Sequence, residues 1–156
     1  KDAMLNALVE QSAGALAKAA ERVVTVGAPS DPEAALRSLV FMLVAAMSDP
    51  QISAAPRLVM TEAQRFPEIA AHYRTHVLEI ARRSVRALMQ AGVGTGHFRP
   101  VDADIAMRIM GGPCIAHMIL TTVFDMVPDG DHEPADIADA ICDILIYGLK
   151  PRTEPS

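Results

Sequence analysis

Hydrophobic residues recur along this chain at intervals of three and four, the spacing that places side chains on one face of an α-helix. Glycine, proline and acidic residues separate these stretches, as they do where one helix ends and the next begins. Few stretches look like strands. We therefore predict an all-α protein, a helical bundle of about six helices. The expected helices cover residues 1–26, 32–48, 55–66, 67–91, 103–125 and 135–149.

The boundary between the third and fourth expected helices is unusual, because an apolar helical run meets Pro67 and helical spacing resumes at once. Proline ends the helix before it, and it suits the first turn of the next helix, where its missing amide hydrogen costs nothing. We expect the short helix to end at Phe66 and to meet the long one at an angle. Met60, Phe66 and Tyr73 would then surround one space.

Composition and charge place limits on the class of protein. The 156 residues are 51% hydrophobic, which suffices for the core of one domain. We expect that domain to cover residues 1–150, followed by a frayed tail at 151–156. The net charge of −5 gives no general attraction to nucleic-acid phosphates. The longest uncharged run, 109–124, is interrupted by glycine and proline and falls short of a membrane span, so we expect no membrane association.

The cysteines indicate a compartment. Cys114 and Cys142 lie far apart in the sequence, each within an apolar helical pattern. Buried free thiols in a reducing environment explain this better than a disulfide framework does. The chain also begins in helical register without a signal peptide. We therefore expect a cytoplasmic protein, and the start resembles a cut through a longer one.

The last two expected helices are apolar on two faces, which is more than one small domain needs. One face can pack on the body of the domain, but the other would form a large apolar patch, which is rare on a monomer. We expect a homodimer in which two helices from each chain form a four-helix bundle. The alternative is that both faces are interior. The expected interface residues are Gly112, Ile115, Ile119, Val123, Ile137, Ile141, Ile144 and Gly148.

Two segments in order carry a family resemblance. RLVMTEAQRFPEIAAHY (57–73), a long helix, and then GHFRPVDADIAMRIMGG (96–112) resemble the C-terminal regulatory domain of TetR-family transcriptional repressors. The opening KDAMLNALVEQ looks like the helix that follows the DNA-reading helix in that family. The family's N-terminal helix-turn-helix would lie ahead of Lys1 and is absent, so operator DNA would be bound only through that missing head.

The resemblance implies a domain that dimerises through its last two helices and holds a small, usually apolar effector among the preceding ones. Effector binding would shift the DNA-binding heads and release the operator, as a ligand biases a two-state equilibrium. Methionines adapt to varied ligands, and a Tyr or His can orient one. The alternative is that these residues are ordinary core. The expected ligand-binding residues are Leu43, Met47, Met60, Phe66, Tyr73, His76, Met110, Cys114 and His117.

A metal-binding protein or enzyme is the alternative class. His72 and His76 stand four residues apart with Glu68 one turn before them, which is a spacing that a metal ion can use. The local sequence directs no cysteine or further acid to the same point, so we expect no metal and no cofactor. The acidic loop at 125–136 departs from the calcium-loop pattern at ligand positions. No nucleophile, base and orienting group fall into a catalytic pattern, so we expect no enzyme.

Overall fold

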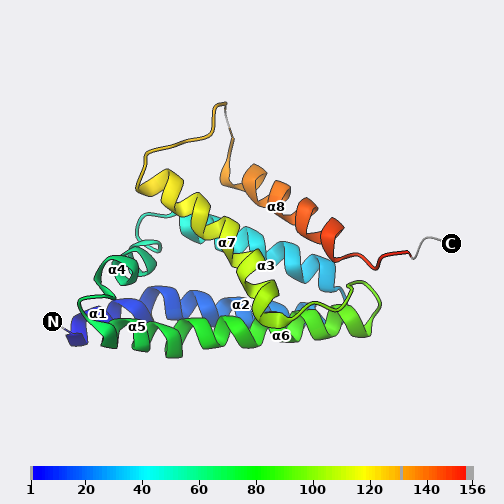
Figure 1. The fold of residues 1–156 in the computed structure, drawn as a ribbon, viewed down its shortest axis with the longest axis horizontal. Coiled ribbons are helices and arrows are strands. Elements are labelled where there is room, and N and C mark those ends of the chain that lie inside the picture. Colours follow the sequence, from blue (N-terminus) through cyan, green and yellow to red (C-terminus); the bar gives the residue numbers. More distant parts are fainter. Residues whose placement is uncertain (1, 131, 154–156) are drawn as a thin grey trace.

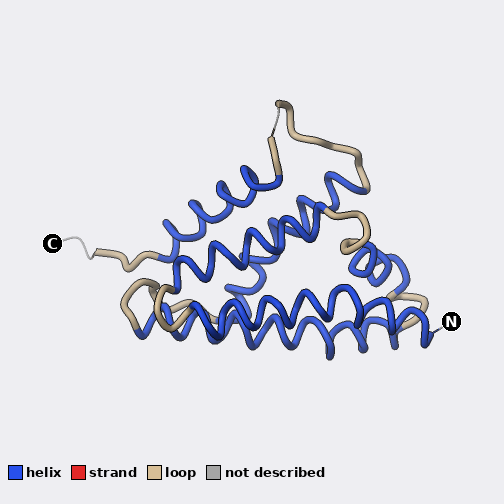
Figure 2. Tube along the Cα trace, turned by 180° about the vertical axis from the view of Figure 1, so that it is seen from behind, coloured by secondary structure: helices blue, strands red, loops and turns tan. Residues whose placement is uncertain are grey.

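The computed structural model describes residues 2–130 and 132–153, and within them it is all-helical without strands (Figures 1 and 2). Two short π-helical segments, written η, each join two α-helices into one continuous rod. The elements form six continuous helical rods, which confirms the predicted all-α bundle of about six helices. The elements are α1 (Asp2–Val9), η1 (Glu10–Gly14), α2 (Ala15–Gly27), α3 (Pro32–Ser48), α4 (Ala54–Glu62), α5 (Pro67–Tyr73), η2 (Arg74–Leu78), α6 (Glu79–Gly94), α7 (Ala103–Thr122) and α8 (Pro134–Leu149).

Two long rods lie side by side at the base of the molecule (Figure 1). One consists of α1, η1 and α2, the other of α5, η2 and α6, and they run in the same direction with η1 against η2. The central helix α3 packs against α2, α6, α7 and α8. Its side chains Leu36, Val40 and Val44 are fully buried, as expected for a helix that is apolar all round.

At the Pro67 boundary α5 begins as predicted, but α4 ends at Glu62 rather than at the expected Phe66, and residues 63–65 form a turn between the two helices. Phe66 is the N-cap of α5 and Pro67 its first residue, so α4 and α5 meet as two separate helices. The corner, however, encloses a second, smaller core rather than an open space. Val9 of α1 and Ile69 of α5 are fully buried there, with Phe66 and Tyr73 packed against them. This core ties the beginning of the first rod to α5.

The turn after α6 joins three helices. The carbonyl of Gly92 accepts hydrogen bonds from the amides of His97 and Phe98, both at 2.9 Å, and the Phe98 ring is buried in the main core. Arg99 reaches the end of α8, donating from its amide to the carbonyl of Leu149 at 2.7 Å and from Nε to that of Gly148 at 2.8 Å. Carbonyls at the ends of α6 and α8 are thereby satisfied.

Some boundaries differ from those predicted. α7 ends at Thr122, earlier than the expected 125, and Asp125 has a positive φ of 53°, a conformation that stops a helix. α6 continues to Gly94. Residue 1, where the first helix was expected to start, lies outside the described residues, as does 154–156 of the expected tail. Residues 151–153 are exposed and not helical.

Candidate functional site

An apolar cavity of about 410 Å³ lies between α2, α3, α7 and the rod of α5, η2 and α6. Small-molecule pockets have volumes of roughly 300–1,000 Å³ and mostly apolar walls, so this one has the size and character for a small ligand. Its walls include Leu16, Ala17 and Ala20 from α2, Leu39, Leu43 and Met47 from α3, Tyr73, Val77, Ala81 and Val85 from the long rod, and Met107, Met110 and Cys114 from α7.

The cavity opens between η2 and α7. Its exposed lining residues are Leu78 on η2 and Arg108 and Gly112 on α7. α7 packs against α6 near its own first turn and then leads away from the long rod (Figure 1). The long rod and α7 therefore diverge beyond this contact, on the side where the exposed lining residues lie.

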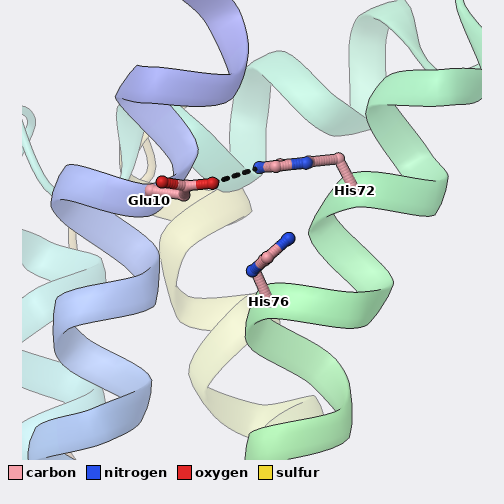
Figure 3. A group of neighbouring side chains, drawn as sticks. All are labelled: Glu10, His72 and His76. Carbon is pink, nitrogen blue, oxygen red and sulfur yellow. Dashed lines mark ion pairs between the residues drawn. The ribbon is translucent and has the colours of Figure 1, made fainter.

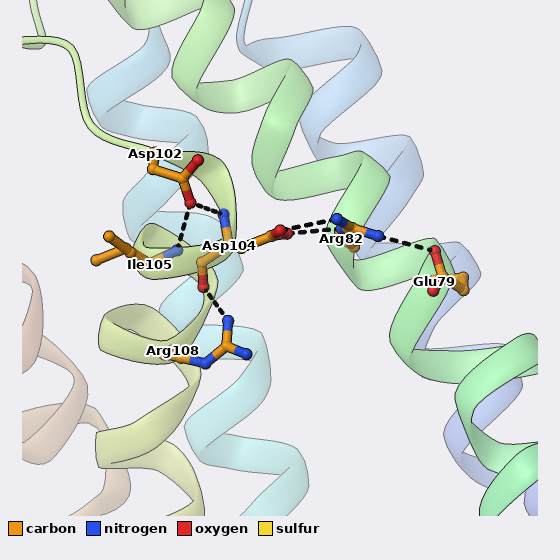
Figure 4. Close-up of polar contacts among 6 residues, drawn as sticks. All are labelled: Glu79, Arg82, Asp102, Asp104, Ile105 and Arg108. Atoms are coloured by element: carbon orange, nitrogen blue, oxygen red, sulfur yellow. Dashed lines mark hydrogen bonds and ion pairs between the residues drawn. The ribbon is translucent and has the colours of Figure 1, made fainter.

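A two-pronged ion pair makes that contact (Figure 4). Arg82 of α6 donates from Nε and Nη2 to the two carboxylate oxygens of Asp104, at 2.6 and 2.7 Å. The hydrogen bond from Arg82 lowers the pKa of Asp104. The Asp102 carboxylate caps α7 by accepting from the amides of Asp104 and Ile105, and Arg108 Nη1 donates to the Asp104 carbonyl at 2.7 Å. Arg82 thus joins α6 to the first turn of α7.

Polar groups in the cavity wall are few. The Ser84 hydroxyl donates to the Ile80 carbonyl at 2.9 Å, and the Cys114 thiol donates to the Met110 carbonyl at 3.5 Å. Burial raises the pKa of Tyr73 to about 12 and that of Cys114 to about 11, so both side chains are neutral near pH 7. The wall therefore suits an apolar ligand, and Tyr73 and Arg108 are lining residues that also carry polar groups.

The expected ligand-binding residues divide into two groups. Five of them line this cavity, one from the long rod and the others from α3 and α7. They are Leu43, Met47, Tyr73, Met110 and Cys114.

The other four do not line it. Met60 is 48% exposed on α4, and Phe66 packs in the second core. His76 is exposed on η2. His117 faces the end of α3, where its Nε2 lies 3.0 Å from the Ser48 hydroxyl. The space expected around the Pro67 corner is therefore filled by core side chains, and the cavity lies further along the long rod, from Tyr73 onward.

Sequence reasoning missed the small residues that create the cavity. Ala17, Ala20 and Ala81 face it from the two long rods, and Gly111 faces it from α7. Small side chains on facing helices leave space that no neighbour fills. The available signal was the alanine-rich stretch ALAKAA and the glycine pair in α7.

The outer surface of α7 and α8 is apolar and uncovered. Of the expected interface residues, Gly112, Val123, Ile144 and Gly148 are exposed, whereas Ile115, Ile119, Ile137 and Ile141 are half-buried against the core. Among the described residues, α7 is the one helix with the length and hydropathy of a membrane span. Only 22% of its most apolar 18-residue segment is buried. Exposed neighbours that were not predicted are Ile105, Ile109, Leu120, Phe124 and Tyr147.

A polar cluster lies at the level of the π-helical segments (Figure 3). Nε2 of His72 is 3.2 Å from Oε1 of Glu10, and the rings of His72 and His76 are 4.2 Å apart. One possible ligand atom from each of these three residues lies within 4.8 Å of the others. The acid beside the histidines therefore comes from the first rod, not from Glu68 as the local spacing indicated.

The described residues thus form an all-helical domain with an apolar cavity and an uncovered apolar face on its last two helices. The family described as tetracyclin repressor-like, C-terminal domain, matches residues 30–130. The chain belongs to this family, which confirms the resemblance seen in the sequence. The match includes α3, the rod of α5, η2 and α6, and α7, and therefore every wall of the cavity except that formed by η1 and α2. No curated protein gives a significant match.

Proposed function

We propose that this chain is the effector-binding and dimerisation domain of a cytoplasmic TetR-like transcriptional regulator. In this proposal a small apolar effector occupies the cavity, and operator DNA is bound by a separate N-terminal head. The observation that carries the proposal is the apolar cavity of about 410 Å³ in a chain of this family. The domain itself performs no catalysis.

The cavity wall offers a route for the effector to act. α2 lines the cavity, and the same rod continues through η1 to α1 at the N-terminal end of the chain (Figure 1). A ligand shifts a conformational equilibrium only by its differential affinity for the two states. An effector that fits best when α2 and α7 are further apart would therefore favour one position of the first rod, and with it one position of an attached head.

Filling the cavity tests effector binding. A Cβ added at Gly111, which lines the cavity, would meet no atom within 4 Å, so Gly111→Leu can place a side chain in the space without a clash at its first carbon. Gly94→Leu is the matched control, because a Cβ there also meets nothing and the residue is outside the cavity. In a thermal-shift screen of aromatic and aliphatic compounds, we expect hits that stabilise the wild type and Gly94→Leu but not Gly111→Leu. Hits that bind all three equally would contradict a ligand in this cavity.

The uncovered face of α7 and α8 supports a dimer. Ile144 is 75% exposed and Tyr147 is 83% exposed, and burying such side chains stabilises a complex by roughly 1.5–3 kcal/mol for each residue of this size. We expect the wild type to sediment as a dimer at micromolar concentration and Ile144→Asp as a monomer. Val26→Asp, at an 80% exposed site on α2, should stay dimeric. A monomeric wild type, or a dimeric Ile144→Asp, would refute this interface.

A further inference from the structure

The two long rods each contain a π-helical segment, and the two segments contact each other. η1 interrupts the first rod at Glu10–Gly14, and η2 interrupts the second at Arg74–Leu78. Single π-helical turns within α-helices are rare overall, but those that occur are often found at functional sites. The polar side chains beside η1 and η2 belong neither to the cavity wall nor to the apolar surface of α7 and α8.

Glu10, His72 and His76 are those side chains, and they converge from the two rods (Figure 3). The His72 ring points across to Glu10, and His76 lies one turn further along the same rod. His72 Nε2 is shielded from solvent and has no hydrogen bond of acceptable geometry, although the Glu10 carboxylate is 3.2 Å away. A shielded nitrogen without a well-aligned partner is costly unless something else satisfies it.

We propose that Glu10, His72 and His76 bind a divalent transition-metal ion, with Zn²⁺ as the best match. Two imidazoles and one carboxylate are a common set of three protein ligands for zinc, and they leave a fourth position for water or another ligand. Imidazole ligands also exclude magnesium and calcium, which prefer oxygen.

The geometry is close to what zinc requires. Metal–ligand distances of 2.0–2.1 Å place tetrahedral ligand atoms about 3.3 Å apart, and the three atoms here already lie within 4.8 Å of one another. Glu10 and His76 are exposed, so neighbouring core side chains do not enclose them and rotation of these two side chains is the expected way to close the remaining distance. His72 is less free, since 18% of its side chain is exposed, and it supplies a fixed first ligand.

The site would fasten the two rods beside the cavity. Other residues of the same segments line that cavity, namely Ala13 of η1 and Val77 and Leu78 of η2, and Tyr73 follows His72 directly. A metal ion held by Glu10 and the histidines therefore fixes the spacing of η1 and η2 at this end of the cavity. This role is separate from the identity of the apolar effector and does not depend on it.

Zinc titration of the full chain by calorimetry tests the site, with Co²⁺ absorption as a report on the ligands. We expect one Zn²⁺ per chain in the wild type. Glu10→Gln, His72→Gln and His76→Gln should each weaken binding by about 100-fold or more, since loss of an outer-shell partner alone costs 10–100-fold. The matched control is His97→Gln, an exposed histidine on the α6–α7 turn, which should bind as the wild type does.

Two results would overturn the proposal. One is a wild type that shows no saturable zinc binding. The other is equal binding by the wild type, Glu10→Gln and His76→Gln, which would assign the metal to scattered surface histidines. Both substituted residues are exposed, so the variants should fold, and far-ultraviolet circular dichroism checks this.

Discussion

Gly92 is the position at which one added methyl group should do the most damage, because Phe98 lies directly against it. A Cβ built at Gly92 would stand 1.9 Å from Cδ2 and 2.5 Å from Cγ of the Phe98 ring. Carbon atoms in contact prefer separations of about 3.5–4.0 Å, so the ring must retreat by more than about 1 Å. Phe98 is 2% exposed, and the amides of residues 97 and 98 both bond the Gly92 carbonyl. Neither ring nor backbone can move without losing contacts.

The cost of Gly92→Ala follows from these opposing effects. Overpacking a core costs about 1–3 kcal/mol, and partial expulsion of the ring loses some of the roughly 1.5–3 kcal/mol gained by its burial. Replacing glycine by alanine within a helix returns about 1 kcal/mol. We expect a net loss of about 2 kcal/mol in the free energy of unfolding, which lowers Tm by roughly 4–8 °C for a chain of this size.

Urea unfolding followed by circular dichroism measures this loss, and Gly94→Ala in the same helix is the control. A Cβ at Gly94 meets nothing within 4 Å, so that variant should be as stable as the wild type or slightly more so. In a Phe98→Ala background the clash is gone, and Gly92→Ala should no longer destabilise. Equal effects at Gly92 and Gly94, or an unchanged penalty without the ring, would refute the reasoning.

Two further predictions concern titratable groups. Burial raises the pKa of Tyr73 from 10.0 to about 12, so the unfolded chain releases the Tyr73 proton at a lower pH than the folded chain does. The wild type should therefore lose stability as the pH rises between those two values, and Tyr73→Phe should lose less. Tyr147→Phe, at an exposed site, should follow the wild type, and identical curves for all three proteins would contradict the shift. Burial likewise raises the pKa of Cys114 and Cys142 to about 11. Both thiols should react slowly with a disulfide reagent at pH 8 and rapidly in denaturant; fast reaction of the folded protein would contradict their burial.

Local patterns were sufficient to predict the helices. Apolar spacing identified all six rods, and Pro67 marked the start of α5. The π-helical segments could not be predicted, because a single wide turn changes the hydrophobic period too little to be seen. The end of α7 was placed too late, since Val123 and Phe124 continue the apolar pattern beyond the last helical turn.

The candidate sites were harder to predict because they depend on packing between distant elements. The cavity is created by alanines and glycines, whose small size gives no strong signal on its own helix. Glu10 lies more than sixty residues before His72 and reaches it only because the two rods run in parallel. On α7 the exposed face includes Ile109, which was not predicted, whereas the expected Ile115 is half-buried. Spacing within one helix fixes none of these relations.

Native mass spectrometry tests the central claim most directly, since it reports assembly and ligand binding together. With a compound from the thermal-shift screen present, the account predicts twice the mass of one chain plus one bound molecule for each chain. Gly111→Leu should give the same dimer without the bound molecule. A single-chain mass at micromolar concentration, or equal retention of the compound by Gly111→Leu, would contradict a dimeric domain that holds its effector in this cavity.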